Sequence, residues 1–415
     1  MKKNIWLVNK YAMPPEFEPR PRSVKFAHYL TLLGYKVTIF GSSVMHNMNR
    51  NLIEDGSSFI EKYYDDIHFV HIQTPSYQKT SGLTRVYSDL YFHWKLRFLA
   101  HKFEKPDVIV GTTSPVLTNP MLSYAHRHGI KYITDMEDMW PDDFVDFGFI
   151  SEQNPLMKLA YRQARHNYMK SDASVFTLSG CYDYFKQKKW DKESGGPVDL
   201  NKVFYINNGV DLDFFNDCLK KYTIDDEDLV QTNKKNIIYL GSIRLVNNLI
   251  QAIKAAEILK DRNDIQFLIY GDGDDREPLI KYCKDHGLEN VKFKAKWTDP
   301  KYVPFILTHS YMNILNYVSS EFAKRGISSG KMFQYMASSR PIVCNINILN
   351  CPITANNIGI AHELKTPEEY AEAMIQLLSL SSSEYEAMCK RAYQTAEQFD
   401  YKNLAKQMDE VIKKM

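Results

Sequence analysis

The chain has 415 residues, of which 44% are hydrophobic and 25% charged, and its formal net charge at pH 7 is +2. A single hydrophobic core usually stops growing at about 250–300 residues, so this length predicts two domains. A charge so close to zero excludes a protein whose main partner is a polyanion, and we expect no nucleic-acid binding.

The 6 cysteines form no C-x-x-C pair, and the 12 histidines do not lie at zinc-ligand spacing. We therefore expect free thiols in a reducing compartment and no metal site. No apolar run reaches the roughly 20 residues of a membrane-spanning helix. The apolar stretch 5–8 is too short for a signal peptide and suits a first buried strand, so we expect a cytoplasmic protein.

Short apolar runs alternate with longer amphipathic stretches, a pattern typical of parallel sheets with crossover helices. In the first half, nearly continuous apolar runs predict strands at 4–9, 36–40, 67–72, 107–111, 131–134, 174–178 and 202–206, and helices at 22–33 and 155–170. The second half predicts strands at 236–241, 265–271, 290–293, 311–315 and 341–344, and helices at 247–259, 275–286, 331–338, 366–379 and 400–415.

The first candidate site follows the strand predicted at 236–241. This strand ends at Gly241, and a polar turn with Ser242 and Arg244 leads into a helix. The free N–H groups and the positive dipole end of a helix start attract an anion, and a guanidinium group can bind two phosphate oxygens. An ordinary turn with a surface arginine fits the same residues.

A second turn, Gly271, Asp272 and Gly273, ends the next strand and precedes another helix. Loops that follow neighbouring parallel strands share one edge of the sheet, so this turn should lie beside the Gly241 turn. In isolation the same three residues are also consistent with a plain turn.

A third segment places Ser328, Ser329, Gly330 and Lys331 at the start of an apolar helix. The backbone N–H groups there suit a phosphate. A basic residue in the first helical turn is unfavourable unless an anion lies nearby, so Lys331 indicates an anion site, with a solvated lysine as the alternative.

In the first half, Glu137, Asp138 and Trp140 follow a predicted strand. Carboxylates at the carboxyl end of a strand suit hydrogen bonds to sugar hydroxyls or proton transfer. An acidic surface loop closed by a packed tryptophan has the same composition. The proline-rich turn after the first strand carries Arg20 and Arg22, and it lacks the G-x-G-x-x-G pattern of a nicotinamide dinucleotide site.

Residues 79–105 are rich in aromatic and basic side chains. An amphipathic helix of this composition can lie against anionic lipid, so this segment predicts contact with a membrane surface. A core-packing helix with a basic outer face is the alternative.

Taken in order, these segments resemble the family 4 glycosyltransferases, which have the GT-B fold, and most of all the branch that assembles O-antigen and capsular polysaccharides. Residues 110–144 are similar to that branch's block of a strand, a small-residue and proline turn, a helix and D-x-x-D-L-W-P. YINNGVDLDFF looks like the family's domain junction, and YLGSIRLVNNL, IYGDGDD, NVKFKAKW and SSGKMFQYMASSRPIV match its nucleotide-sugar segments.

The resemblance implies the fold class, which is α/β with two Rossmann-like, doubly wound parallel-sheet domains that face a cleft. Residues 1–208 would form the acceptor-side domain, and the helix 400–415 would cross back to it. Residues 209–399 would form the domain that binds the nucleotide sugar.

The resemblance also implies roles for individual residues. Arg244 and Lys331 would hold the donor diphosphate, and the catalytic set would be Arg244, Lys331, Glu137 and Asp138. The acceptor side would include Arg20, Arg22 and Trp140. The donor-binding set would share the loops of the second domain and comprises Gly241, Ser242, Arg244, Gly271, Asp272, Gly273, Trp297, Ser329, Gly330, Lys331 and Gln334.

The chain departs from the family at three positions. Gly326 and Gln334 stand where many members have a pair of glutamates, and Asn247 stands where many have a lysine. A glutamine can hydrogen-bond ribose without charge, so Gln334 remains the ribose-binding residue of this prediction.

The implied activity is a retaining, metal-independent transfer of a hexosyl or N-acetylhexosaminyl group from a nucleotide-diphosphate sugar, with a UDP-sugar as the expected donor. The acceptor would be a glycan or a polyprenyl-diphosphate-linked sugar in capsule or O-antigen biosynthesis, at the inner face of the membrane. No cofactor is expected, because the donor is a substrate. Two alternatives stay open: a GT-B UDP-sugar 2-epimerase and a non-catalytic nucleotide-sugar-binding protein.

Overall fold

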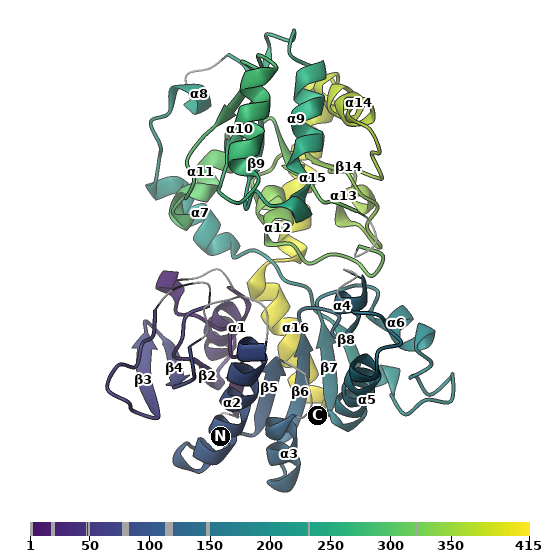
Figure 1. Ribbon diagram of the computed structural model, residues 1–415. Coiled ribbons are helices and arrows are strands. Elements are labelled where there is room, and N and C mark those ends of the chain that lie inside the picture. Colours follow the sequence, from purple (N-terminus) through teal and green to yellow (C-terminus); the bar gives the residue numbers. More distant parts are fainter. Residues whose placement is uncertain are drawn as a thin grey trace. The chain divides into compact units, whose positions relative to one another are not determined.

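The computed structural model describes residues 3–17, 21–46, 48, 50–76, 83–112, 119–146, 150–230, 233–319 and 323–415. The chain separates into two compact units, one of Met1–Asn207 with Tyr401–Met415 and one of Asn208–Asp400 (Figure 1). This division falls one residue before the predicted junction at 208/209. Each unit is a parallel sheet with helices on both faces, which confirms the predicted α/β class.

The first unit is built on an eight-stranded sheet in the order β3-β4-β2-β1-β5-β6-β7-β8. All neighbouring strands are parallel except β3 and β4, which form an antiparallel hairpin at the edge. The strands are β1 (Asn4–Val8), β2 (Lys36–Ser42), β3 (Phe59–Tyr64), β4 (Ile67–Ile72), β5 (Val108–Thr112), β6 (Lys131–Met136), β7 (Ala173–Phe176) and β8 (Val203–Tyr205).

The hydrophobic core of this unit lies on both faces of the sheet. Along β1, Ile5 and Leu7 face one core and Trp6 and Val8 the other, as the alternation of side chains along a strand requires. Helices α1 (Pro21–Leu32) and α16 (Tyr401–Lys414) pack side by side, as Figure 1 shows. The remaining helices are η1 (Pro15–Phe17), α2 (Leu83–Leu99), η2 (Ala100–Lys102), α3 (Pro120–Arg127), α4 (Asp142–Asp146), α5 (Pro155–Lys170), α6 (Cys181–Gln187) and η3 (Leu200–Lys202).

The second unit is built on a six-stranded, fully parallel sheet in the order β11-β10-β9-β12-β13-β14. Its strands are β9 (Lys235–Leu240), β10 (Ile265–Tyr270), β11 (Val291–Phe293), β12 (Met312–Leu315), β13 (Ile342–Cys344) and β14 (Gly359–Ala361). Its helices are α7 (Leu212–Lys221), α8 (Glu227–Val230), η4 (Leu245–Asn247), α9 (Leu249–Ile258), α10 (Arg276–Asp285), η5 (Pro300–Tyr302), α11 (Val303–Thr308), α12 (Gly330–Ala337), α13 (Pro352–Ala355), α14 (Pro367–Leu378) and α15 (Ser382–Gln398).

One predicted helix is divided in the structure. The sequence predicts a continuous helix over 247–259, whereas a short 3-10 turn, η4, ends at Asn247 and α9 begins at Leu249. Asn248 between them has φ 42° in the left-handed region, which asparagine tolerates better than most residues. The break lets the loop after β9 turn sharply before α9 begins.

Replacement of Met408 by alanine tests how α16 is held in the first unit. Met408 is 1% exposed and packs in the core with α1 and β1. Loss of a buried methionine side chain leaves a cavity, and we expect Met408→Ala to lower the free energy of unfolding by roughly 2–5 kcal/mol. Denaturant unfolding followed by circular dichroism measures this change. The exposed neighbour Gln407→Ala is the control, and an equal loss in both variants would mean that α16 is not docked through Met408.

Candidate functional site

The sheet of the second unit has one place where the strand order reverses, between β9 and β12. In open parallel sheets, ligands bind outside the carboxyl ends of the strands at this switch point. The loop after β9 contains Gly241, Ser242 and Arg244, so topology puts the first predicted segment at the usual place for a ligand.

The loops after β9 and β10 lie in direct backbone contact. Gly241 N–H donates to the Tyr270 carbonyl at 3.1 Å, and Ile243 N–H donates to the Asp272 carbonyl at 2.8 Å. Gly271 has φ 126°, and a Cβ there would lie 1.9 Å from the Gly241 carbonyl oxygen. Any side chain at Gly271 would therefore push the two loops apart, which explains the glycine.

The side chain of Lys331 lies across the Gly241 turn. A Cβ on Gly241 would lie 2.7 Å from Lys331 Cδ, so the lysine stem occupies the space that glycine leaves free. Lys331 Nζ donates to Asn247 Oδ1 at 2.9 Å and to the Tyr239 hydroxyl at 3.2 Å. Its ammonium also faces the rings of Tyr239 and Tyr317, at 5.0 and 5.8 Å from their centroids.

No carboxylate in the described part of the chain pairs with this ammonium. Burial lowers the pKa of Lys331 to about 8, because the charged form loses water and gains only neutral hydrogen-bond partners. A desolvated cation without a counter-ion is the arrangement expected where an anionic ligand binds.

Helix α12 directs its N-terminus at the same turn. Ser329 is the N-cap residue, and its side chain makes no capping hydrogen bond. The buried Tyr335 of α12 both donates to the Leu240 carbonyl and accepts from the Leu240 N–H at 3.2 Å, which fixes the helix against the end of β9. The uncapped N–H groups at Gly330 and Lys331 and the positive dipole end therefore lie at the Gly241 turn.

The other predicted donor residues are more exposed. Arg244 is exposed, and its guanidinium has no partner among the described residues. Ser242 is exposed, but its carbonyl accepts hydrogen bonds from the Tyr239 hydroxyl at 2.6 Å and from Asn247 Nδ2 at 2.8 Å. Asp272 is also exposed.

Two further predicted donor residues lie at the margins of this arrangement. Gln334 is half-buried on α12 and its side chain makes no hydrogen bond within the described residues. Trp297 is 74% exposed on the loop after β11. The same loop reaches the site through Ala295, whose carbonyl accepts from Gly271 N–H at 2.9 Å. The structure therefore brings Gly241, Gly271 and Lys331 close together, leaves Arg244 and Trp297 exposed to solvent, and half-buries Gln334.

Sequence reasoning missed three residues that contact Lys331 or its partners. Tyr239 lies in a buried strand and Tyr317 just after one, so both match the pattern of core residues. Asn345 holds the Tyr317 backbone, accepting from its N–H at 2.9 Å and donating to its carbonyl at 2.8 Å. Buried asparagines directly after strands, Asn316 and Asn345, were the signal available in the sequence.

In the first unit, Arg22 forms a buried ion pair with Asp135. Its guanidinium binds both carboxylate oxygens of Asp135, at 2.9 and 2.8 Å, and Nη1 donates to the Asn207 carbonyl at 2.9 Å. Arg22 is 2% exposed. This geometry favours a structural role for Arg22, which joins the end of β6 to Asn207, over the acceptor contact predicted for it. Arg20 lies outside the described residues.

The acidic segment after β6 divides into a buried and an exposed part. Glu137 is half-buried and accepts from Asn9 Nδ2 at 3.4 Å. Asp138 is exposed, and its carboxylate has no partner among the described residues. The indole N–H of Trp140 is buried without a hydrogen-bond partner in the same part of the chain, and its ring packs edge-on against Phe144 at 4.8 Å. Asp138 and Trp140 thus retain free polar groups.

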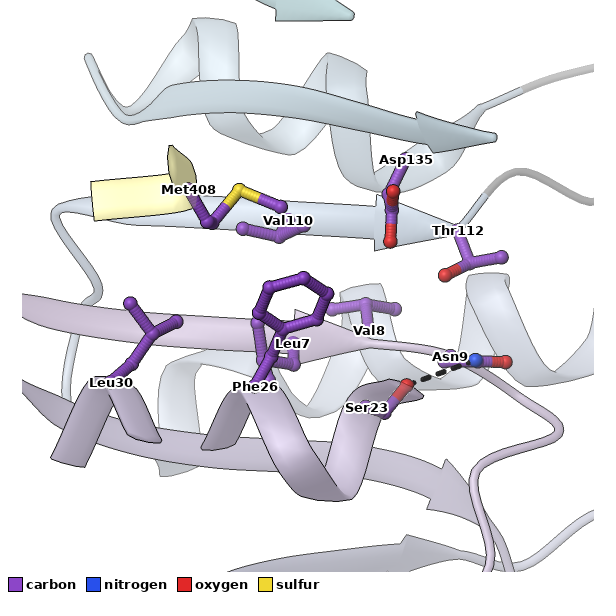
Figure 2. A pocket seen from close by; sticks show the side chains of 10 residues that line it. All are labelled: Leu7, Val8, Asn9, Ser23, Phe26, Leu30, Val110, Thr112, Asp135 and Met408. Carbon is purple, nitrogen blue, oxygen red and sulfur yellow. Dashed lines mark hydrogen bonds between the residues drawn. The ribbon is translucent and has the colours of Figure 1, made fainter. Parts of the chain in front are cut away.

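A small cavity lies at the switch point of the first sheet, between β1 and β5 (Figure 2). Its volume is about 10 Å³, enough for about one water molecule and far below the several hundred Å³ of a ligand pocket. The lining residues are Leu7, Val8, Asn9, Ser23, Phe26, Leu30, Val110, Thr112, Asp135 and Met408. This cavity is a packing void with a polar rim, and it is too small to accommodate a sugar.

Two wider hollows contain none of the predicted site residues. One, of about 440 Å³, lies beside α10 and β11, and the other, of about 250 Å³, between α3 and α5. Among the described residues, no three His, Cys, Asp or Glu side chains gather as a metal ion would require. In the same residues, no helix combines the length and apolar character needed to cross a bilayer.

Comparisons with known proteins agree with this fold. Residues 221–395 match the family model for glycosyl transferases group 1. No curated protein sequence matches the chain. The matched residues lie within the second unit, which therefore resembles the group 1 glycosyl transferases.

Solved structures resemble the chain over its whole length. They include sucrose-phosphate synthase from Thermosynechococcus elongatus, with 12% identity, a TM-score of 0.69, and coverage of 100% of this chain and 99% of that one. Anabaena HepE in complex with UDP-glucose has 13% identity, a TM-score of 0.64 and full coverage of both chains. WaaG, a glycosyltransferase involved in lipopolysaccharide biosynthesis, has 12% identity, a TM-score of 0.65 and 99% coverage of both. The whole chain thus has the fold of the GT-B glycosyltransferases, and its second unit matches the family model for glycosyl transferases group 1.

The desolvated ammonium of Lys331 should lower the free energy of unfolding of the protein. We expect Lys331→Met to raise the free energy of unfolding at pH 7 by up to about 1 kcal/mol, since methionine keeps the stem and removes the buried charge. The pKa of Lys331 in the folded state, about 8, lies below the ordinary value of 10.5. The loss of folding stability caused by the buried charge is therefore complete below pH 8, and it disappears as the pH rises toward 10.5. Denaturant unfolding at pH 7 and pH 10 measures it. A variant that is less stable at pH 7 would contradict the assignment of Lys331 as an uncompensated cation.

Proposed function

We propose that the protein transfers a hexosyl or N-acetylhexosaminyl group, with retention at the anomeric carbon, from a UDP-sugar to a glycan or polyprenyl-diphosphate-linked acceptor. The reaction would serve the assembly of a surface polysaccharide such as capsule or O-antigen. The group 1 family of the second unit supports transfer from a nucleotide sugar. The similar fold of Anabaena HepE, which was solved with UDP-glucose, supports a uridine donor, and that of WaaG supports a role in surface glycans.

One observation carries the proposal: the Lys331 ammonium lies over a glycine turn, at an uncapped helix N-terminus, with only neutral partners. The diphosphate of a nucleotide sugar would supply the missing negative charge. Backbone N–H groups and the ammonium would each give it a charge-assisted hydrogen bond.

The same arrangement would assist the reaction. The bond between the anomeric carbon and the diphosphate oxygen breaks, and negative charge grows on the leaving diphosphate. The acceptor oxygen bonds to the anomeric carbon and passes its proton to an oxygen of the leaving diphosphate. Lys331, Arg244 and the N–H groups of α12 would stabilise that charge without reorganising, which is the usual source of such catalysis. Asp138, exposed and unpaired among the described residues, remains the candidate to face the reacting sugar or acceptor.

Removal of either cation should slow transfer steeply. We expect Arg244→Ala and Lys331→Met each to lower turnover by roughly 10²–10³-fold, the usual effect of deleting one electrostatic contact to a developing charge. UDP release measured with a lipid-linked sugar acceptor, in buffer with EDTA, reports turnover and tests independence from metal. Arg262→Ala is the matched control, since Arg262 is exposed on the same unit and pairs with Asp264.

Near wild-type turnover in both site variants would overturn the assignment. The products also separate the alternatives. Interconversion of UDP-sugars without an acceptor would indicate an epimerase, and donor binding without any turnover would indicate a non-catalytic binding protein.

Helix α2 supports the membrane-facing part of the proposal. Tyr87, Trp94 and Phe98 are 59%, 42% and 69% exposed, and their spacing of seven and four residues places them on one face of the helix. Arg97 lies over the Trp94 ring at 5.7 Å, and the exposed Lys102 follows the helix. Aromatic side chains flanked by cations suit the headgroup region of an anionic bilayer. Residues 79–82 of the predicted segment lie outside the described residues.

A double variant tests this face. We expect Trp94→Ser with Phe98→Ser to lower binding to vesicles of phosphatidylglycerol and phosphatidylcholine by roughly tenfold or more, because two interfacial aromatic anchors are lost. Co-sedimentation with the vesicles measures binding. Tyr63→Ser is the control, since Tyr63 is 72% exposed and lies on the edge strand β3, outside α2. Equal vesicle binding by the double variant and the wild type would exclude α2 as the contact.

A further inference from the structure

Asn247 is a buried side chain whose orientation is fixed by its neighbours. It is 5% exposed and closes the short 3-10 turn after Arg244. Its Nδ2 donates to the Ser242 carbonyl at 2.8 Å and to Ser242 Oγ at 3.1 Å. A carbonyl oxygen only accepts, so the amide nitrogen must face Ser242, and Oδ1 is left to face Lys331 Nζ at 2.9 Å.

The other groups around the Lys331 ammonium are also neutral near pH 7. The Tyr239 hydroxyl donates its hydrogen bond to the Ser242 carbonyl, so the Tyr239 oxygen can accept a hydrogen bond from Lys331. Burial raises the pKa of the Tyr239 phenol. Burial raises the pKa of the Tyr317 phenol and of the Cys344 thiol in the same way. Asn247 is therefore the one of these groups that offers the ammonium a carbonyl-type oxygen at short range.

We propose that Asn247 is a positioning residue: its neutral oxygen holds the Lys331 ammonium over the Gly241 turn without cancelling the charge that the donor diphosphate needs. The inference rests on the proposed function, since it assumes that a diphosphate binds at this turn. A carboxylate in the same place would hold the ammonium as well, but it would pair with the charge and repel the diphosphate. An apolar side chain would offer the ammonium no hydrogen-bond acceptor to fix its position.

The variant Asn247→Asp separates the holding of the ammonium from the neutralisation of its charge, because aspartate keeps the shape of the asparagine side chain and adds a negative charge. The new carboxylate should raise the pKa of Lys331 above 8, since an opposite charge favours the ammonium form. UDP affinity at pH 7 should fall by roughly tenfold or more, because the ammonium is paired and the site gains a negative charge. Asn247→Ala should also weaken UDP roughly tenfold, without raising the pKa of Lys331.

Two measurements on the full-length protein test this. Competitive acetylation followed by mass spectrometry gives the pKa of the Lys331 amine without any ligand, and so does not depend on the proposed function. Isothermal titration with UDP between pH 7 and 9.5 gives affinity. In the wild type, affinity should fall as the pH rises through about 8, where Lys331 loses its charge, and in Asn247→Asp this fall should move to higher pH.

Asn248→Asp is the matched control, since it adds the same charge one residue away on a side chain that reaches Gln251. An unchanged pKa of Lys331 in Asn247→Asp, or an equal change in the control, would overturn the contact. A shifted pKa with unchanged UDP affinity would overturn the positioning role. The wild type could also fail to bind UDP although Asn247→Asp shifts the pKa of Lys331. This result would contradict both the proposed uridine donor and the positioning role of Asn247, while it would confirm the contact between Asn247 and Lys331.

Discussion

The contact between the backbones of two neighbouring loops is the constraint on which the site depends. The loops after β9 and β10 run so close together that Gly271 cannot carry a Cβ, and two backbone hydrogen bonds join them. Since Gly241 also lacks a side chain, Lys331 can cross directly above the turn. A backbone approach of this kind lets N–H groups, a helix N-terminus and an ammonium converge within a space too small for side chains on both loops.

Two buried cations of the chain illustrate opposite solutions to the same electrostatic problem. Arg22 has lost its water, and Asp135 compensates with two short hydrogen bonds, so the pair joins elements of the first unit. Lys331 is held by an amide oxygen and a hydroxyl, neither of which carries charge, and its pKa falls to about 8. The first arrangement neutralises its charge within the fold, whereas the second leaves the ammonium without a charged partner among the described residues, as is typical of sites for anions.

The buried polar side chains around the second switch point connect the loops that form the site. Asn345 links the segment after β12 to α9 through Gln251, and Asn316 donates to the Asn248 carbonyl. Tyr335 attaches α12 to β9. Each of these groups satisfies a backbone or amide partner that would otherwise be buried without a hydrogen bond, and together they hold the loops after β9, β12 and β13 and helix α12 in one arrangement.

The sequence by itself determined the two parallel sheets, because buried strands are nearly continuous apolar runs and the helices between them are amphipathic. It did not indicate β3, whose exposed edge position leaves a polar pattern, FIEKYY, or the break at Asn248. It also placed the Gly241 and Gly271 turns at one sheet edge, since loops after neighbouring parallel strands share that edge, and the family resemblance assigned Lys331 at the start of a helix to the same site. Only the tertiary structure decided which cations are paired: Arg22 pairs with Asp135 across 113 residues, while Lys331 contacts Asn247 across 84 residues and pairs with no carboxylate in the part of the chain that the structure describes. Such pairings depend on contacts between distant segments, and no local pattern of residues encodes them.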